Sequence, residues 1–383
     1  MMHILMVTGE YPPLTGGVGD YTRLLARALI REGHRVRIAA TTGTPAAGRG
    51  GADEPEVLTL PRRWARGHKM AIARLARAEP DSWIHVQYQT AAYRMNPEVN
   101  RSPAAWSARG LRVAWTYHDL LPPYLFPLAG NTRRQRVTLA PGRASRMVVA
   151  TNREDADRLA QAGIRAEVSP VGSNIPIAPL KPRERADLRD SWQARPGEPV
   201  IGCFGLAGRT KGLQTLVEAA RLLKSKGTDL RIVIIGGTPG ASDRSNAAFL
   251  QSLQSAIRSA GLEDRVHWTG ALSDQEVSRA LSACDLMVQP YTEGASTRHG
   301  SLMACLDHGC ATITSTPLSD SWLAPGVPTV PPLDFLALAS RIACLAASPE
   351  KRAAAAAAAR TSAADRSWER IADQHAALYA AAA

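Results

Sequence analysis

Apolar residues change their spacing twice within the first forty positions of the chain. Residues 3–8 form a short apolar run typical of a buried strand, and a segment rich in Gly and Pro follows at 9–19. Over residues 20–32 the apolar positions recur at helical spacing, with arginines on the opposite side. A second strand-like run occupies 35–40. The pattern predicts a β-loop-α-β unit.

The same alternation continues through both halves of the chain. Further strands are predicted at 83–88, 112–117, 146–150, 200–204, 230–235, 265–268, 285–288 and 311–314, with a helix at 212–226 and helices from residue 350 onward. The intervals are long enough for helices, which favours parallel sheets with crossover connections. The Pro-rich passage 169–185 is typical of a connection between domains.

We therefore expect an α/β protein with two Rossmann-like, doubly wound domains. The expected boundaries are 1–172 and 173–365, followed by a C-terminal helix, 366–383, that packs back on the N-terminal domain. Ligands of such folds bind at the carboxyl ends of the strands, so a site in the cleft should draw on both domains.

The net charge of +12 lies mainly in the N-terminal domain. Residues 1–172 contain 24 Lys and Arg against 14 Asp and Glu, whereas 173–383 contain 22 against 20. A basic field favours phosphorylated or otherwise anionic partners. Because 40 of the 46 basic residues are Arg, coding bias is an equally good explanation. No recognised nucleic-acid motif accompanies the charge, and we expect no nucleic-acid partner.

Composition and cysteine usage narrow the class of protein. With 45% apolar and 21% charged residues, the 383-residue chain is neither disordered nor a coiled coil. Its five cysteines lack the paired spacing of a disulfide framework, and no leader-like segment precedes the first strand. No apolar run approaches the ~20 residues of a transmembrane helix. These features predict a cytoplasmic protein.

Three closely spaced glycines, Gly16, Gly17 and Gly19, stand between the first strand and the first helix. Backbone N–H groups and the helix dipole at this place can face a phosphate or a sugar. The spacing does not match the dinucleotide-binding GxGxxG fingerprint, and a tight turn without a ligand is the alternative interpretation.

Seven segments follow one another along the chain: EYPPLTGGVGDYTRLLARALIREGHRV, PDSWIHVQYQ, TYHDL, FGLAGRTKGLQTLVEA, VHWTGALSD, ACDLMVQPYTEGASTRHGSLMACLDHGCATITS and SWERIADQHAALY. Together they resemble the retaining glycosyltransferases of family 4. The resemblance covers nearly the whole chain and implies the GT-B fold of the glycogen-synthase-like superfamily. It also implies that Gly16 and Gly17 lie near the donor diphosphate and that Gly19, Asp20 and Tyr21 lie on the acceptor side.

His118 and Asp119 directly follow a predicted strand. An isolated His is more often a packed or capping residue than a ligand-binding one. The resemblance implies instead that the imidazole of His118 contacts the transferred sugar near the reacting carbon. No activated Ser or Cys and no orienting group is recognisable beside it, so we assign it no nucleophilic role.

Lys211 comes six residues after Gly205, which ends the first strand of the second domain, and it precedes a helix. Its ammonium can neutralise charge on a leaving diphosphate. Family members usually have an Arg directly after the strand glycine, whereas this chain has Leu206. Arg209 in the same loop is the candidate replacement.

Glu293 begins a loop that the resemblance places near the donor sugar or its phosphates. The family has a second Glu eight residues later, which holds the ribose hydroxyls. Here that position is Ser301, or Ala304 when the loop is aligned from its end. Gly300, Ser301 and Leu302 are predicted to begin a helix whose N–H groups suit a β-phosphate.

Arg298 stands just before this helix and is a second candidate for the cation that position 206 lacks; a solvated loop charge is the alternative. We expect no metal, because Cys305, His308 and Cys310 lack the two-pair spacing of a zinc site. We also expect no pyridoxal phosphate, because the matching lysine is assigned to phosphate binding.

The stretch 62–78 is basic and partly amphipathic. Such a segment suits peripheral contact with an anionic bilayer surface, such as the inner membrane face, at about 1 kcal/mol per nearby charge. A solvated helix is the alternative.

The favoured function is transfer of a sugar from a nucleotide-diphosphate sugar, bound by the C-terminal domain, to a hydroxyl acceptor bound by the N-terminal domain. Retention of anomeric configuration is implied, with His118, Lys211 and Glu293 as catalytic candidates. Three alternatives stay open: a non-catalytic sugar-nucleotide or glycan-binding relative, a related epimerase or phosphorylase, and a membrane or polyanion adaptor.

Overall fold

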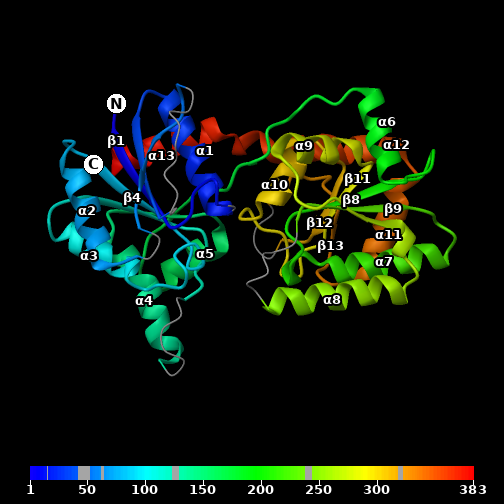
Figure 1. Cartoon of the computed structure of the whole chain (residues 1–383), viewed down its shortest axis with the longest axis horizontal. Coiled ribbons are helices and arrows are strands. Elements are labelled where there is room, and N and C mark those ends of the chain that lie inside the picture. Colours follow the sequence, from blue (N-terminus) through cyan, green and yellow to red (C-terminus); the bar gives the residue numbers. More distant parts are fainter. Residues whose placement is uncertain (15, 42–51, 62–63, 123–128, 238–243, 318–321) are drawn as a thin grey trace. The chain divides into compact units, whose positions relative to one another are not determined.

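Two parallel β-sheets organise the chain, one in each of two separate units (Figure 1). The computed structural model describes residues 1–383 except 15, 42–51, 62–63, 123–128, 238–243 and 318–321. Unit 1 comprises Met1–Asn174 and Arg366–Ala383, and unit 2 comprises Ile175–Asp365. The C-terminal segment therefore belongs to the same unit as the N-terminus.

The sheet of unit 1 has seven strands in the order β3-β2-β1-β4-β5-β6-β7, and each neighbouring pair is parallel. The strands are β1 (His3–Thr8), β2 (Arg35–Ala40), β3 (Glu56–Thr59), β4 (Trp83–Tyr88), β5 (Arg112–Tyr117), β6 (Met147–Ala150) and β7 (Glu167–Val168). The helices are α1 (Gly17–Arg31), α2 (Arg66–Arg77), α3 (Ser102–Ser107), α4 (Gly130–Ala144), α5 (Arg153–Gln161) and α13 (Trp368–Ala381), with the 3-10 turn η1 (Val99–Arg101).

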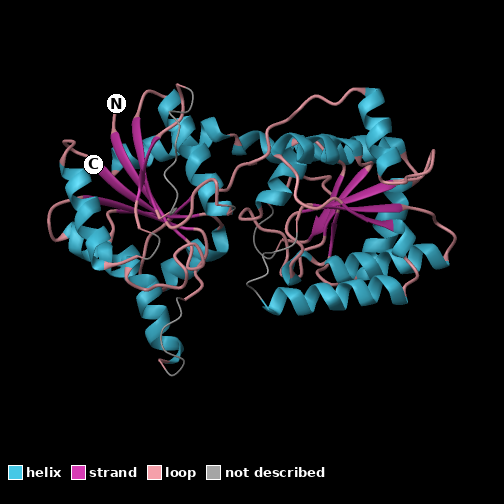
Figure 2. Ribbon diagram, viewed as in Figure 1, coloured by secondary structure: helices cyan, strands magenta, loops and turns pink. Residues whose placement is uncertain are grey.

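Helices cover both faces of this sheet (Figure 2). Leu25 of α1 and Tyr379 of α13 belong to one apolar cluster, and Ile72 of α2 belongs to another. Alternate residues of β4 enter the two clusters, Trp83 the first and Ile84 the second, because successive side chains of a strand point to opposite faces. All six residues of β4 are buried, as expected for a central strand of a covered parallel sheet.

The sheet of unit 2 has six parallel strands in the order β10-β9-β8-β11-β12-β13. They are β8 (Val200–Phe204), β9 (Arg231–Ile235), β10 (Val266–Trp268), β11 (Leu286–Gln289), β12 (Thr312–Ser315) and β13 (Thr329–Val330). The surrounding elements are α6 (Pro182–Ser191), η2 (Arg209–Lys211), α7 (Leu213–Ser225), α8 (Arg244–Ser259), η3 (Glu263–Arg265), α9 (Asp274–Ala283), α10 (Gly300–Asp307), α11 (Phe335–Ala346), α12 (Pro349–Ala363) and η4 (Ala364–Arg366).

Two apolar clusters flank this second sheet. Ile201 of β8 packs in a cluster with α7, α8 and α11, and its neighbour Val200 lies in a cluster with α9. Both units are therefore doubly wound α/β folds, as the sequence predicted. Every strand that the sequence predicted is present to within one residue.

Three predictions of local structure need correction. The short strands β3, β7 and β13 were not predicted, because two to four residues give too little periodicity. The connection 169–185 is shorter than predicted, since α6 begins with Pro182 at a position where proline is favoured. The helix predicted at 20–32 begins at Gly17. None of the helices within the described ranges has both the length and the apolar character to cross a bilayer.

Gly212 joins the end of η2 to the start of α7 in a left-handed conformation, with φ +68°. A Cβ atom at this position would lie 1.8 Å from the carbonyl oxygen of Pro290, in the loop after β11. Backbone from two strand-end loops therefore meets at this glycine, which fixes Lys211 beside the loop that follows β11.

We predict that Gly212→Ala destabilises the chain by about 3 kcal/mol or more, because left-handed strain of about 1–2 kcal/mol adds to overpacking of about 1–3 kcal/mol against backbone. Gly227→Ala is the matched control: φ is +74°, and no atom lies within 4 Å of the added methyl group. Urea unfolding of the full chain measures both variants. Equal losses at the two positions would contradict the contact with Pro290.

Candidate functional site

The carboxyl end of β8 supports a cluster of polar side chains in unit 2. Gly205, directly after β8, has φ +129°, and its N–H donates to the carbonyl of Ile235 at 3.0 Å. A Cβ here would lie 3.1 Å from Nζ of Lys211 and 3.4 Å from Cβ of Ser301. A glycine at 205 therefore leaves the space in which these two side chains meet.

Lys211 is held by two contacts. Its Nζ donates to Oγ of Ser301 at 2.7 Å and lies 5.0 Å from the centroid of the Tyr291 ring. An aromatic face attracts an ammonium, and this attraction favours the charged form. Burial acts in the opposite direction and lowers the pKa of Lys211 from its ordinary value of 10.5. Judged by its solvent-accessible surface, however, Lys211 is only half-buried.

Tyr291 connects the residues around Lys211. Its hydroxyl lies 2.8 Å from Oγ of Ser301, and its ring stacks on the imidazole of His299 at 3.7 Å and 14°. The N–H of Ser296 donates to Nδ1 of His299 at 3.2 Å. Burial, together with the charges of Lys211 and Arg298, lowers the pKa of His299 to about 2. The histidine is therefore neutral at physiological pH.

The first turn of α10 presents backbone N–H groups beside Ser301. The amides of Gly300 and Ser301 donate to no other residue that the structure describes. The amide of Leu302 donates to the carbonyl of His299 at 2.9 Å, and so does that of Met303 at 3.0 Å. The amide of Leu302, one of the predicted phosphate donors, thus already has a partner in the first turn of the helix, and its phosphate contact stays a prediction.

The loop before α10 carries an ion pair. Nη2 of Arg298 lies 3.2 Å from Oε2 of Glu293, and the Glu293 side chain is 58% exposed. Leu206, which stands where family members have Arg, is 50% exposed, and Arg209 is also exposed. The charges of Arg298 and Glu293, which the sequence predicted as site residues, thus partly cancel each other.

The first turn of α1 in unit 1 is occupied by a carboxylate of the chain itself. Oε1 of Glu10 accepts hydrogen bonds from the amides of Val18, at 3.0 Å, and Gly19, at 3.4 Å. A Cβ at Gly16 would lie 2.1 Å from this oxygen, so the glycine leaves room for the carboxylate. Burial raises the pKa of Glu10, with a contribution from Asp20, although the two amides oppose the shift.

The other predicted residues of this helix have different surroundings. A Cβ at Gly17 would meet nothing within 4 Å, and nothing in the structure explains a glycine there. Asp20 accepts a hydrogen bond from Nδ2 of Asn174 at 3.4 Å. Tyr21 is 1% exposed, with its ring edge-to-face against those of His118 and Trp368. The Tyr21 ring is thus a core residue, and the acceptor-side assignment of this position stays a prediction.

His118 lies at the end of β5 and is only 8% exposed. Its Nε2 is 3.0 Å from Oε1 of Gln87, and its ring centroid is 4.7 Å from that of Tyr21. Burial, with a smaller effect of His375, lowers the pKa of His118 to about 3. The imidazole is therefore neutral at physiological pH and held in place from two sides.

The residues described by the structure include no group of three or more His, Cys, Asp or Glu that could hold a metal ion. His308 is engaged on both ring nitrogens, Nδ1 with the carbonyl of Ala304 and Nε2 with Oγ of Ser278, each at 2.8 Å. The five cysteines are unpaired thiols.

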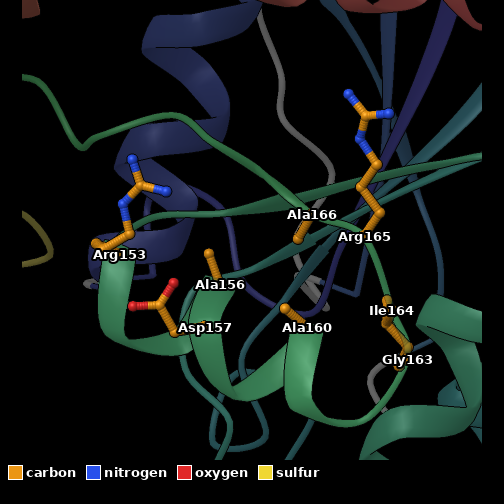
Figure 3. Close-up of a pocket in the computed structure, with 8 residues that line it drawn as sticks. All are labelled: Arg153, Ala156, Asp157, Ala160, Gly163, Ile164, Arg165 and Ala166. Carbon is orange, nitrogen blue, oxygen red and sulfur yellow. The ribbon is translucent and has the colours of Figure 1, made fainter.

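Two hollows lie in unit 1 away from the predicted site residues. One, of about 360 Å³, lies beside α5 and is lined by the charged side chains of Arg153, Asp157 and Arg165 with small or apolar neighbours (Figure 3). The other, of about 240 Å³, lies beside α2 and is called here the α2 hollow. It is lined by Lys69, Met70, Ala73, Arg74, Arg77 and Arg109.

Comparisons with known proteins agree with these two sheets and with the order of the motifs. Residues 15–174 match the family described as Glycosyltransferase Family 4, and residues 184–318 match Glycosyl transferases group 1. Each half of the chain thus matches a glycosyltransferase model, and the chain is a glycosyltransferase of family 4 type.

Relatives of this family 4 chain include named transferases. It is 23% identical over 318 residues to the GDP-mannose-dependent alpha-(1-6)-phosphatidylinositol monomannoside mannosyltransferase of Mycobacterium tuberculosis, covering 77% of this chain and 74% of the other. It is 31% identical over 94 residues to the 2-deoxystreptamine glucosyltransferase of Streptomyces kanamyceticus, which is 24% of this chain and 22% of the other.

Solved structures share the fold. Sucrose-phosphate synthase from Thermosynechococcus elongatus superposes with a TM-score of 0.75 at 20% identity, covering 100% of this chain and 99% of the other. Anabaena HepE in complex with UDP superposes with a TM-score of 0.75 at 18% identity, covering 99% and 100%. The family 4 chain therefore has the GT-B fold that the resemblance implied.

Sequence analysis missed four residues of this family 4 chain that organise the candidate site: Glu10, Gln87, Tyr291 and His299. Each acts through a contact with a residue that was predicted. Glu10 carries a usable sequence signal, since it stands two residues after the first strand, at the start of the glycine loop.

We predict opposite effects of alanine at two adjacent glycines of the family 4 chain. Gly16→Ala should displace Glu10 from the first turn of α1 and destabilise unit 1 by about 1–2 kcal/mol, the usual cost of a lost helix cap. Gly17→Ala should stabilise α1 by up to about 1 kcal/mol through helix propensity. Thermal unfolding measures both variants, and equal shifts would contradict the role of Glu10.

Proposed function

We propose that this chain transfers a sugar from a nucleotide-diphosphate sugar to a hydroxyl acceptor, with retention at the anomeric carbon. The observation that carries the proposal is the cluster in unit 2. The ammonium of Lys211 is hydrogen-bonded to Ser301, beside the amides of Gly300 and Ser301 at the start of α10, which donate to no residue within the described ranges. A cation, a hydroxyl and a helix N-terminus together suit a phosphate group.

The charge that develops during transfer explains why this cluster is useful. Cleavage of the bond between sugar and phosphate leaves negative charge on the nucleoside diphosphate, and fixed donors in a partly dehydrated site stabilise that charge without reorganisation. Contacts with Ser301 and Tyr291, both within unit 2, hold Lys211 in place. We propose that Arg209 and Arg298 add positive charge from the two flanking loops, while Glu293 holds Arg298.

Retention needs the incoming hydroxyl on the face that the leaving group departs from. We propose that the leaving phosphate itself removes the proton from this hydroxyl, so no protein nucleophile is required. His118 is neutral and its Nε2 is engaged by Gln87, which suits a contact with a sugar hydroxyl rather than attack on the anomeric carbon. In this proposal the chain's own cations do the work that Mg²⁺ does elsewhere, and neither metal nor pyridoxal phosphate takes part.

The relatives support the donor class. One is named as dependent on GDP-mannose, and HepE has been solved with UDP-glucose. We therefore propose a nucleoside diphosphate hexose as donor, bound by unit 2, with the acceptor bound by unit 1 near Gly19 and Asp20.

We further propose that the enzyme is cytoplasmic and touches an anionic membrane surface, such as the inner face, through the α2 hollow. Four cations and no carboxylate line this hollow, and Met70 beside them is 67% exposed. Arg62 and Arg63 of the same basic stretch lie outside the described residues. The relative named for phosphatidylinositol monomannoside supports an acceptor located at a membrane.

The donor class is tested with a panel of UDP-, GDP- and ADP-hexoses, scored first by thermal shift of the full chain and then by release of free nucleotide with candidate acceptors. We expect at least one nucleotide sugar to raise the unfolding temperature and to be consumed. Stabilisation without turnover would favour the non-catalytic alternative. Stabilisation by no nucleotide would overturn the proposal.

We predict that Lys211→Ala lowers kcat about 100- to 1,000-fold, equivalent to about 3–4 kcal/mol, because one preorganised donor to the leaving group is lost. Ser301→Ala should cost less, since the ammonium remains. Lys226→Ala removes an exposed lysine of the same unit and should leave kcat unchanged. Near wild-type turnover of Lys211→Ala, measured as nucleotide release, would refute the phosphate assignment.

We predict that the full chain sediments with vesicles of phosphatidylglycerol but not with vesicles of phosphatidylcholine, and that salt weakens the association. Replacing Lys69, Arg74, Arg77 and Arg109 by Gln should weaken binding up to about 1,000-fold, because four charges at about 1 kcal/mol each amount to about 4 kcal/mol. The control carries the same loss of charge at the exposed residues Arg183, Lys226, Arg258 and Arg279. An equal loss in the control would indicate a net-charge effect rather than this hollow.

A further inference from the structure

Unit 1 contains a chain of buried polar side chains within its apolar core. His85 and Gln87 lie two residues apart on β4, on the face that carries Trp83 and packs against α1 and α13. Thr116 lies on β5, and Tyr379 on α13. The exposure of all four side chains is 0%. Buried polar groups are costly unless they are hydrogen-bonded, so the hydrogen-bond partners of these four side chains determine their roles.

The links run from His118 to the C-terminal helix. Nε2 of His118 lies 3.0 Å from Oε1 of Gln87, and Nε2 of Gln87 lies 3.3 Å from Nε2 of His85. The same Nε2 of His85 lies 2.7 Å from Oγ1 of Thr116. Nδ1 of His85 hydrogen-bonds to the hydroxyl of Tyr379, 294 positions later in the sequence.

An amide side chain bridges two imidazole nitrogens in this arrangement. One end of an amide only accepts a hydrogen bond and the other end only donates, so one of the two Nε2 atoms must carry a proton and the other must not. This complementarity holds for either orientation of the Gln87 amide. In the orientation of the structure, Nε2–H of His118 donates to Gln87, and Nε2 of His85 accepts from it.

Because both histidine rings are neutral, the position of the proton on one ring fixes its position on the other. Burial lowers the pKa of His118 to about 3 and lowers that of His85 well below 6.5, helped by the other histidines nearby. Each ring therefore carries one proton at neutral pH. With its proton on Nε2, His118 has a lone pair on Nδ1. His85 has no proton on Nε2, so its proton lies on Nδ1 and faces Tyr379.

We propose that Gln87 and Tyr379 are positioning residues that set the tautomer and orientation of His118. Through them the C-terminal helix α13 takes part in the site, and His118 offers a lone pair on Nδ1 that suits a hydrogen bond from a sugar hydroxyl. The sugar contact rests on the proposed function. The coupling of the two tautomers does not.

The experiment is nitrogen NMR of the full chain labelled with ¹⁵N-histidine, because protonated and unprotonated ring nitrogens resonate in separate regions. We expect opposite protonation at Nε2 of His118 and His85 in the wild type. Gln87→Glu offers two accepting oxygens and should place a proton on both Nε2 atoms. Tyr379→Phe removes the acceptor of the His85 Nδ1 proton and should shift the tautomer populations of both rings without removing apolar contacts.

Turnover supplies the second readout. Gln87→Met should lower kcat about tenfold with the donor KM unchanged. If this variant does not fold, Gln87→Glu and Tyr379→Phe are measured in its place. Asn100→Leu is the control: Asn100 is also buried in unit 1 but bonds to Tyr88 and Val137, and it should leave both tautomers as they are.

Equal protonation at the two Nε2 atoms of the wild type, or an unchanged His85 tautomer in Gln87→Glu, would overturn the inference. An equal loss of kcat in Asn100→Leu would reject the positioning role. If no nucleotide sugar is consumed, the proposed function fails, and the NMR result still decides the coupling.

Discussion

The parallel pairing of the strands in both sheets, within the part of the chain that the structure describes, is the constraint on which the candidate site depends. In a parallel sheet covered by helices on both faces, a polar side chain along a strand is costly unless it is hydrogen-bonded, as His85 and Gln87 are, so groups that can meet a ligand collect where the strands end. Glu10 comes shortly after β1, His118 after β5, Gly205 after β8, and Tyr291 after β11. The chemistry of this transferase is thus placed at strand ends by the burial of everything between them.

Lys211 and Ser301 illustrate how a departure from the family pattern changes the electrostatics of such a strand end. Counted eight residues from Glu293, the position of the family's second carboxylate holds Ser301, whose hydroxyl accepts a hydrogen bond from Lys211 at 2.7 Å; aligned from the end of the loop, that position is Ala304. The hydroxyl fixes the ammonium and leaves its charge available, while the nearby Glu293 carboxylate is engaged by Arg298.

The sequence predicted every strand except β3, β7 and β13, the doubly wound architecture and the residues Lys211, Gly300 and Ser301 that lie together in unit 2, because apolar runs and glycines are local signals. It could not predict the partners of those residues. Glu10 meets Val18 eight positions away, Lys211 meets Ser301 ninety positions away, and His85 meets Tyr379 nearly three hundred positions away. The burial of Tyr21 and the engaged amide of Leu302 follow from packing and helix closure, which the spacing of residue types does not encode.

The return of α13 to unit 1 has a consequence for synthesis on the ribosome. Residues 1–174 emerge first, yet the apolar face formed by α1 and β4 receives Ile371, Ala372 and Tyr379 only after all of unit 2 has been translated. Unit 1 is therefore made first but completed last. Throughout the elongation of unit 2, the nascent chain exposes a hydrophobic surface of the kind that chaperones bind.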